Sequence, residues 1–474
     1  MITLPLFHRP TSRFNGRALP RSKPILLSEM GPAPGFWAPL SRFRFLLDKR
    51  QRGIASSLLL LFAATTPAAD LQVPSRQFPT ISSAISAAND GDSIHLATGV
   101  FQENITLDKA LTLLGSPDNR SIIDGSGSGT VITITSPNAR VSGVAVRNSG
   151  DIIEDSDACI YATKDATNIK LDGNSLTQCA FGIWINGSHN PVVINNTVTG
   201  YQKRLISDRG NGIHIWNIQN GLIKENRVFG VRDGIYLSNT SRSSIEDNVM
   251  DSVRFGIHYM YNDNNRVTGN TTCNSTVGQA MMFSKRLVIN HNAMINNRDH
   301  GMLLRAIYDS KIHGNIAYGN NKGIFINDSD FNEITGNWVE GNAVGIAVMA
   351  GAENTQVVGN NFVSNPVQVL FSWRFSLYWN NEERGNYWSD YLGWDYDGDG
   401  IGDRIYYASN RMDHLMHRHP KMRLLALSPV IQLLQALETR FPVLRSASVI
   451  DKKPAMHPTT PIPDQVTAPE KACL

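Results

Sequence analysis

The sequence predicts an all-β fold, a right-handed parallel β-helix whose coils are each about 22 residues long. Two sequence columns share this period, and every coil contains short segments in which apolar and polar residues alternate. A unit of this length is too short for a strand and a covering helix. The alternation therefore indicates stacked, half-buried strands that form a solenoid.

The two columns are a glycine that precedes an apolar residue and a recurring asparagine. The glycines are Gly182, Gly212, Gly234, Gly256, Gly301, Gly323 and Gly345, and Gly278, which precedes Gln279, lies in the double step between Gly256 and Gly301. The asparagines are Asn174, Asn196, Asn226, Asn248, Asn270, Asn292, Asn315, Asn337 and Asn360. One asparagine step of 30 residues marks an eight-residue insertion at 201–208. We expect these asparagines to be structural, each tolerating a left-handed turn and hydrogen-bonding its equivalent one coil away.

Both ends of the repeat have signals of their own. Residues 80–89 predict an amphipathic helix with Thr80 as its N-cap, which would cover the open edge of the first coil. The repeat fades after residue 371. We therefore predict a signal segment with an over-long start (1–69), a parallel β-helix (70–371), a C-terminal cap (372–410), and a helical extension with a tail (411–474).

The extension contains one clear helix signal. Ser428 suits an N-cap, Pro429 suits the first helical position, and Pro442 ends the segment. Its apolar residues exceed one narrow stripe, so we expect the helix either to seal the last coil or to dock onto a partner.

The segment before the repeat is typical of a secretory signal peptide. Basic residues from Arg42 to Arg52 precede an apolar run over 54–64, and small residues follow at 66–69. Such a run is too short to cross a hydrocarbon layer of ~30 Å, although an uncleaved anchor is the alternative. We predict a Sec-type exported protein whose mature chain begins near Asp70, outside the cytoplasm.

Charge and cysteine content exclude two classes of protein. The 474 residues contain 44 Lys and Arg against 41 Asp and Glu, so no basic excess indicates a nucleic-acid partner. Four cysteines are too few for a disulfide scaffold in an exported chain of this length. Cys159 and Cys179 lie on adjacent predicted coils and could form a bridge.

Alternation also predicts which side chains leave the core. Pairs such as Ile213 and Ile215, or Ile257 and Tyr259, should point inward. The first outward column is Trp184, His214, Tyr236, His258, Ala280, Leu303, Phe325 and Ala347. The second is Asn186, Trp216, Ser238, Met260, Met282, Arg305, Asn327 and Met349. These columns are rich in aromatic and apolar groups, which predicts a partner-binding surface that includes Trp184, Trp216, Tyr236 and Phe325.

One coil of this face carries soft metal ligands. His258 and Met260 share a strand, and Met282 should lie beside Met260 on the next coil, ~4.8 Å away. An imidazole and two thioethers suit Cu(I). His214 lies two coils away and is a secondary candidate. The alternative interpretation is ordinary surface packing, in which methionine fills gaps.

Two further segments are candidate metal sites. Asp395, Asp397, Asp399 and Asp403 alternate around a glycine turn and resemble a structural calcium loop, but the closing glutamate of an EF-hand is replaced by Tyr406. A second copper candidate is the dense cluster of Met412, His414, Met416, His417 and His419.

Exported β-helices include many carbohydrate-active enzymes, whose chemistry needs accessible carboxylates. The two outward columns contain neither Asp nor Glu. Asp233 and the Asp299–His300 pair are the nearest candidates, so a polyuronate lyase, epimerase or hydrolase remains an alternative, as does a metal-free periplasmic adaptor.

Several stretches of this sequence resemble one family, the NosD-type maturation proteins of nitrous oxide reductase. They are FGIHYMYND (255–263), AMMFSKRLV (280–288), RDHGMLL (298–304), GNYWSDYLGWDYDGDGIGDRIY (385–406) and LLALSPVIQLLQALETRFPVL (424–444). They follow the family's order and cover most of the mature chain. Met281, where the family pattern has Leu, and the Met and His enrichment at 412–422 depart from it.

The resemblance implies a non-enzymatic accessory protein. Such proteins work at the inner membrane with the ATPase and permease subunits of an ABC transporter, with nitrous oxide reductase, and with a copper-donating lipoprotein. Their implied role is to load copper, with sulfide as a second candidate cargo, into the reductase's catalytic copper cluster. His258, Met260 and Met282 fall in the family's HYMY and MFS motifs, which implies a transient Cu(I) site there.

Overall fold

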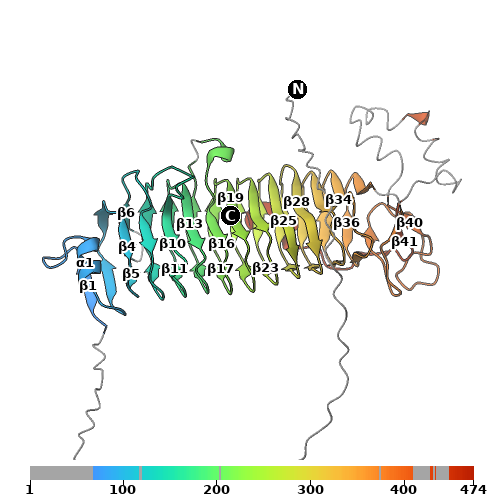
Figure 1. Cartoon of the computed structure of the whole chain (residues 1–474). Coiled ribbons are helices and arrows are strands. Elements are labelled where there is room, and N and C mark those ends of the chain that lie inside the picture. Colours follow the sequence, from blue (N-terminus) through green and yellow to red (C-terminus); the bar gives the residue numbers. More distant parts are fainter. Residues whose placement is uncertain are drawn as a thin grey trace, which may run out of the picture. The chain divides into compact units, whose positions relative to one another are not determined.

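The computed structural model describes residues 68–116, 120–201, 204–372, 375–408, 428–430, 433 and 448–473. These residues form a parallel β-helix of about 14 turns, which confirms the predicted fold class (Figure 1). The predicted signal segment and the Met and His cluster at 412–422 lie outside the described residues, as does almost all of the helix predicted over 424–444. Among the described helices, none is long and apolar enough to cross a lipid bilayer.

Three parallel sheets run along the solenoid. The first consists of β1 (Asp70–Val73), β2 (Ser93–Leu96), β5 (Thr112–Leu114), β8 (Arg140–Ser142), β11 (Lys170–Asp172), β14 (Val192–Ile194), β17 (Leu222–Lys224), β20 (Ser244–Glu246), β23 (Arg266–Thr268), β26 (Val288–Asn290), β29 (Lys311–His313), β32 (Glu333–Thr335) and β35 (Gln356–Val358).

The second sheet has the longest strands and carries the predicted outward columns. It consists of β4 (Ile105–Leu107), β7 (Ile132–Ile134), β10 (Ala158–Ala162), β13 (Phe181–Asn186), β16 (Ile213–Trp216), β19 (Asp233–Ser238), β22 (Phe255–Met260), β25 (Val277–Lys285), β28 (His300–Tyr308), β31 (Lys322–Asn327), β34 (Val344–Val348) and β37 (Val367–Phe371).

The third sheet completes each coil. It consists of β3 (Gly99–Phe101), β6 (Ser121–Asp124), β9 (Ala145–Arg147), β12 (Ser175–Thr177), β15 (Thr197–Thr199), β18 (Arg227–Phe229), β21 (Val249–Asp251), β24 (Thr271–Cys273), β27 (Ala293–Ile295), β30 (Ile316–Tyr318), β33 (Trp338–Glu340), β36 (Asn361–Val363) and β39 (Tyr387–Trp388). The insertion predicted at 201–208 contains one short 3-10 helix, η1 (Ile206–Asp208).

The glycine column is explained by the close approach of successive coils. Gly234 faces the interior, where an added Cβ would lie 2.5 Å from Met250 Cγ and 2.5 Å from the carbonyl oxygen of Gly256. A Cβ added to Gly256 would likewise lie 2.5 Å from the carbonyl oxygen of Gly278. A side chain at these positions would push the coils apart, so the repeat requires glycine for space rather than for a left-handed backbone.

The asparagine column forms a buried ladder, as predicted. Asn270 Nδ2 donates to Asn292 Oδ1 at 3.0 Å and to the carbonyl of Ile245 at 2.8 Å, and Asn248 donates to Asn270 in turn. The prediction that these residues adopt the left-handed turn is wrong. The residue before each asparagine does so, as at Gly269 (φ 69°) and Asp247 (φ 52°).

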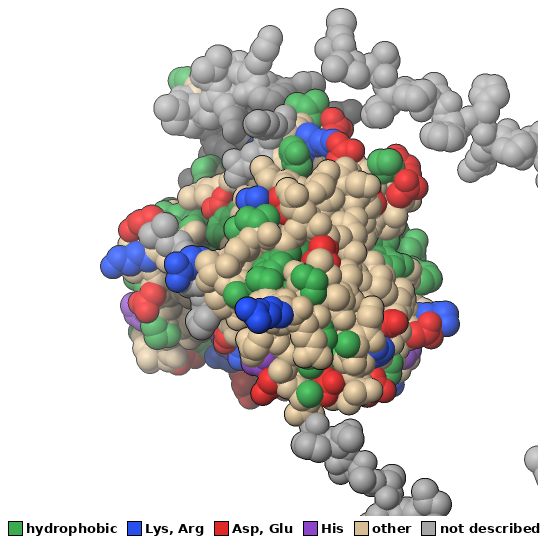
Figure 2. Space-filling model, turned by 90° about the vertical axis from the view of Figure 1, so that its left-hand side faces the viewer, with side chains coloured by type: hydrophobic (Ala, Val, Ile, Leu, Met, Phe, Trp, Pro, Cys, Tyr) green, Lys and Arg blue, Asp and Glu red, His purple; other side chains and the backbone are tan. Residues whose placement is uncertain are grey.

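Helix α1 (Ile81–Ala87) covers the first coil. Thr80 is its N-cap and forms a capping box with Ser83, which confirms the predicted cap. The Glu103 carboxylate accepts from the first two helical amides, and Lys109 Nζ donates to carbonyls at the other end. At this end of the solenoid, charged side chains interrupt the hydrophobic ones, which keeps the sheet edge from pairing with another chain (Figure 2).

The far end is closed by a small sheet of β38 (Leu377–Tyr378), β41 (Val449–Asp451) and β40 (Tyr406–Tyr407). Asn386 ends the ladder, and its amide donates to buried Asp451 at 2.7 Å. Two one-turn helices follow, α4 (Asp464–Thr467) and α5 (Pro469–Ala472).

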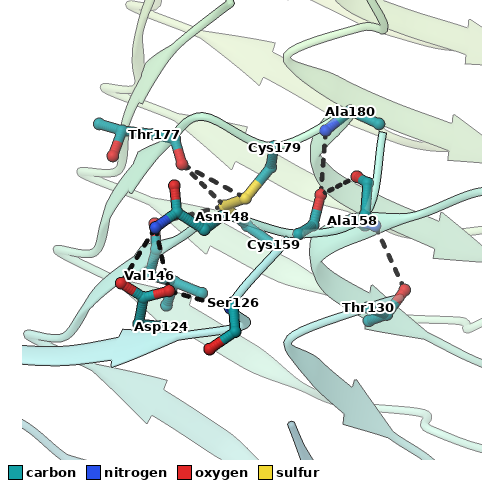
Figure 3. The surroundings of a disulfide bond; sticks show 12 residues. Asp124, Ser126, Thr130, Val146, Asn148, Ala158, Cys159, Thr177, Cys179 and Ala180 are labelled. Atoms are coloured by element: carbon teal, nitrogen blue, oxygen red, sulfur yellow. Dashed lines mark hydrogen bonds between the residues drawn. A yellow bond between two sulfur atoms is a disulfide. The ribbon is translucent and has the colours of Figure 1, made fainter. Parts of the chain in front are cut away.

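Two disulfides join the described cysteines. Cys159 in β10 is bonded to Cys179, just before β13, which confirms the bridge between adjacent coils (Figure 3). The second, between Cys273 and Cys473, spans 200 residues and was not predicted. No repeat pattern links its C-terminal cysteine to a coil.

Candidate functional site

The outward face of the second sheet has the predicted register. The backbone pairs Trp184 with His214, His214 with Tyr236, Tyr236 with His258, and His258 with Ala280. Inward neighbours such as Ile257 and Tyr259 are fully buried. The first outward column is therefore a continuous line of side chains across successive coils.

Aromatic rings in this column stack on one another. The ring centroids of Trp184 and His214 lie 4.1 Å apart and are nearly parallel, at 6°. Tyr236 follows at 4.7 Å from His214 and 5.0 Å from His258. Trp184, Tyr236 and His258 are consequently partly buried, with only 12% of the His258 side chain exposed, whereas Trp216 in the second column is 43% exposed.

His258 is held by a buried carboxylate. Its Nδ1 lies 3.0 Å from Oδ2 of Asp233, whose side chain is completely buried. Arg254 donates to both oxygens of the same carboxylate, at 2.7 Å and 2.6 Å. Burial acts to raise the pKa of Asp233, but the hydrogen bonds from His258 and Arg254 outweigh it and hold that pKa below its usual value.

This contact fixes the tautomer of neutral His258. An ionised carboxylate can only accept, so Nδ1 must carry the proton that it donates to Asp233. Nε2 then keeps its lone pair. Carboxylates that orient histidines in this way are common behind metal-binding imidazoles.

His214 has the opposite arrangement. Arg232 Nε donates to Asn211 Oδ1 at 3.3 Å, which turns the amide nitrogen of Asn211 toward His214 Nδ1 at 3.0 Å. His214 Nδ1 therefore accepts, and the proton of the neutral ring lies on Nε2. Burial, together with the positive charge of Arg232, lowers the pKa of His214 to about 4.

The two thioethers, Met260 and Met282, lie in the outward column next to that of His258. Met260 is directly paired with Met282 on the next coil, and both side chains are half-exposed. Ala280, paired with His258, contributes only a methyl group between the imidazole and the following coil. The face thus presents one nitrogen with a free lone pair and two sulfurs within two adjacent coils.

Each methionine is followed by an exposed aromatic residue at a corner of the solenoid. Tyr261 (φ 58°) and Phe283 (φ 49°) both have left-handed backbones, and their rings stack with centroids 5.3 Å apart. A hollow of about 380 Å³ lies against them, and Tyr308 also lines it. The left-handed backbone recurs at this corner on successive coils, as at Asn239 (φ 54°) and Ala306 (φ 53°), so it belongs to the coil, and only the aromatic side chains set this corner apart.

The carboxylates considered for sugar chemistry are placed differently. Both oxygens of Asp233 are occupied and the side chain has no exposed surface. Asp299 is partly exposed, and the charged side chain that lies near it, Arg298 at 3.7 Å, is a cation and not a second acid. His300 packs against Phe325, and burial together with the charge of Lys322 lowers its pKa to about 4. None of these residues forms a pair of accessible acids.

The aspartate loop brings three of its four acids together. Ligand oxygens of Asp395, Asp397 and Asp399 lie within 4.8 Å of one another. Asp403 instead accepts from the amide of Tyr396 at 2.6 Å. The Asp395 carboxylate accepts from three backbone amides of the turn, so calcium binding there stays a prediction. The copper candidates Met412, His414, Met416, His417 and His419 lie outside the described residues.

The Asp233–His258 contact was not predicted. Strict alternation places Asp233 inward with Ile235, but Gly234 and Ile235 both face the interior, and this shifts Asp233 to the outer face. The recurring glycine was the available signal, since it marks this irregularity on every coil.

A family model described as "Periplasmic copper-binding protein (NosD)" matches residues 194–393. A "Probable ABC transporter binding protein NosD" from Pseudomonas aeruginosa is 39% identical over 383 residues, which cover 78% of this chain and 89% of that protein. Its namesake from Stutzerimonas stutzeri is 35% identical over 418 residues, covering 85% of this chain and 93% of that protein.

Solved structures share only the fold. A family 28 exopolygalacturonase from Yersinia enterocolitica has a TM-score of 0.52 at 13% identity, covering 66% of this chain and 78% of its own. The A-module of a mannuronan C-5 epimerase from Azotobacter vinelandii has a TM-score of 0.50 at 14% identity, covering 62% and 90%. At these identities the likeness concerns the β-helix and not its chemistry.

Proposed function

The chain belongs to the NosD family, and from this premise we propose that it is a periplasmic accessory protein that carries Cu(I) toward the catalytic copper cluster of nitrous oxide reductase. The proposed ligands are His258, Met260 and Met282. The family description, a periplasmic copper-binding protein, supports copper as the cargo. The region that matches the family model contains all three ligands.

The observation that carries this proposal is the Asp233–His258 contact. Because Asp233 accepts from Nδ1 at 3.0 Å, His258 offers Nε2 on the face that bears both methionine side chains. Met260 and Met282 are paired neighbours, ~4.8 Å apart along the stack. One imidazole and two thioethers form a neutral, soft ligand set that prefers Cu(I) to hard cations.

The same geometry suits a transient site. All three side chains belong to a sheet face rather than to a closed cavity, and both methionines are half-exposed. A donor or acceptor could therefore replace one ligand at a time. The role of this protein would be to hold and pass on the ion without chemistry of its own, and we propose no catalytic residue.

Partners are proposed from the relatives and from the surface. The relatives' names support an ABC transporter, with its ATPase and permease at the inner membrane. Nitrous oxide reductase would receive the copper, and a lipoprotein would supply it. We propose that Trp216, together with the partly buried Trp184, Tyr236 and Phe325, contributes to docking these partners.

Competition with a Cu(I) chelator tests the site. The mature protein should bind one Cu(I) per chain. A His258→Ala, Met260→Ala, Met282→Ala variant should lose at least roughly 100-fold in affinity, which corresponds to about 2.7 kcal/mol.

A matched control lies on the same face. Met349→Ala removes one thioether outside the proposed ligand set, and it should leave the affinity within about twofold. Equal affinity in the triple variant and the wild type would exclude this site as the place where copper is held.

A further inference from the structure

The C-terminal tail returns along the third sheet as a strap, which we define as residues 459–473. It begins at the far end of the solenoid, where Thr459 donates to the carbonyl of Gly359 at 2.6 Å and Asn361 donates to Thr460 at 2.9 Å. It ends at Cys473, which is bonded to Cys273 in β24. The chain therefore finishes beside the middle of the stack (Figure 1).

The strap covers an apolar strip on the outside of the solenoid. Outward residues of four successive coils are buried beneath it, namely Cys273, Ala293, Ile295, Ile316 and Trp338. Val466 and Ala472 of the strap pack against this strip. On the preceding coils the residues of the same column, Arg227 and Val249, are exposed or half-exposed. The strap accounts for this difference.

Between its two ends the strap is weakly attached. Its helices α4 and α5 have one turn each and contain no buried residue. Within the described part of the chain, residues 461–472 form no hydrogen bond with the solenoid; the bonds they make stay within the tail. The Cys273–Cys473 bond is thus the principal attachment of this segment.

The two disulfides differ in accessibility and in what they restrain. Cys159 is fully buried, Cys179 is 7% exposed, and the coils they join are already hydrogen-bonded through β10 and β13. Cys273 is also fully buried, but Cys473 is half-exposed at the end of the strap. Cys473 is therefore the most exposed of the four bonded cysteines, which makes the second bond the more accessible of the two to a reductant.

We propose that Cys273–Cys473 is a thiol–disulfide exchange site at which a dithiol releases the strap. A thiolate of the dithiol attacks Cys473 Sγ and forms a mixed disulfide, while Cys273 leaves as a thiolate and takes up a proton. The second thiolate of the dithiol then attacks the mixed disulfide and frees Cys473. The dithiol is oxidised, and two electrons reduce the protein bond to two thiols.

Release of the strap would uncover the apolar strip while the solenoid stays folded. The coils under the strap are paired by their own strands and by the asparagine ladder, neither of which involves residues 459–473. The uncovered residues, with Ile295 and Trp338 among them, would form a contiguous hydrophobic surface of the kind that marks an interaction site.

Hydrogen exchange of the mature protein under native conditions, with and without dithiothreitol, tests this proposal. Alkylation after reduction should label Cys273 and Cys473 and leave Cys159 and Cys179 bonded. The hydrogen-bonded amides of this segment, those of Val466, Thr467, Ala468 and Lys471, should exchange at least tenfold faster, while those of β27 and β30 should not change. Emission from Trp338 should move to longer wavelength as its ring meets water.

Two variants keep the outcome clear. Cys273→Ser with Cys473→Ser should reproduce the reduced state without dithiothreitol, and Cys159→Ser with Cys179→Ser should leave strap protection unchanged. Persistent protection of 461–473 in reduced protein and in the first variant would overturn the proposal. Reduction of Cys159–Cys179 before or together with the second bond would also overturn it.

Discussion

The asparagine ladder and the outer face of the second sheet are built on the same coils, yet they obey opposite rules. In the ladder each coil repeats one residue, and each amide finds the same partners. On the outer face the same register holds a changing set of residues, from Trp184 through His258 to Phe325, and no residue type recurs along the whole column. Repetition indicates where the solenoid derives stability, and the variable outer face is where we propose that the protein binds copper and its partners.

The largest effect should come from breaking the ladder. Asn270→Ala removes donors to Asn292 and Ile245 and the acceptor used by Asn248, leaving buried polar groups without partners. The free energy of unfolding should fall by about 3 kcal/mol. Urea denaturation measures this loss. Asn327→Ala, on the half-exposed outer face, is the matched control and should change stability by less than about 0.5 kcal/mol.

The second prediction tests the outer face through the residue behind His258. Asp233→Asn keeps the side-chain shape, but the amide can turn its NH₂ group toward Nδ1, which would move the imidazole proton to Nε2. Affinity for Cu(I) should fall roughly 10- to 100-fold. Asp251→Asn, on the third sheet, should leave it unchanged. An unaltered affinity in Asp233→Asn would show that the carboxylate does not position the imidazole.

A third prediction concerns a place where the interior itself departs from repetition. Gln279 lies between Ile257 and Met302 in an inward column, is fully buried, and has no hydrogen-bond partner at either amide atom within the described residues. Gln279→Met keeps the volume and removes the polar atoms, so stability should rise by about 1–2 kcal/mol. A fall in stability by urea denaturation would mean that the amide is satisfied in solution.

The smallest predicted effect is a dependence on pH. Because burial lowers the pKa of His300 from its usual 6.5 to about 4, the unfolded chain binds this proton between these values and the folded protein does not. Stability is therefore present above pH 6.5 and lost as the pH falls toward 4. His300→Phe should reduce this loss by about 1 kcal/mol, a figure discounted for partial exposure.

Stability at neutral pH provides the check on that substitution. His300 Nδ1 has no partner among the described residues, so His300→Phe removes no hydrogen bond from that atom. The variant should match the wild type at pH 7.5, and the two denaturation curves should separate only below pH 6.5. Parallel curves across the whole range would contradict the assignment.

The fold could be predicted because its constraints repeat. Glycine at each close approach and asparagine at each ladder position recur on almost every coil, so a single sequence contains many copies of the same evidence. The one mistaken detail, the left-handed asparagine, arose because the turn residue and the ladder residue are neighbours. Gly269 adopts the left-handed backbone and Asn270 forms the hydrogen bonds.

The site could be predicted only in part. Register placed Met260 beside Met282 because strand pairing is periodic. The Asp233–His258 contact escaped because one irregular glycine reverses the expected direction of Asp233. The Cys273–Cys473 bond escaped for another reason. Its C-terminal cysteine lies 200 residues away, in a tail that has no repeat and hence no predicted register.

In the proposed site, one coil of the outer face holds Cu(I) through His258 Nε2 and the sulfur of Met260, and the next coil adds the sulfur of Met282. X-ray absorption spectroscopy of the Cu(I)-loaded mature protein tests it most directly. The spectrum should show one nitrogen and two sulfur scatterers. The nitrogen should be lost in His258→Ala, and sulfur should be lost in Met260→Ala with Met282→Ala. A copper shell that is unchanged in these variants would contradict it.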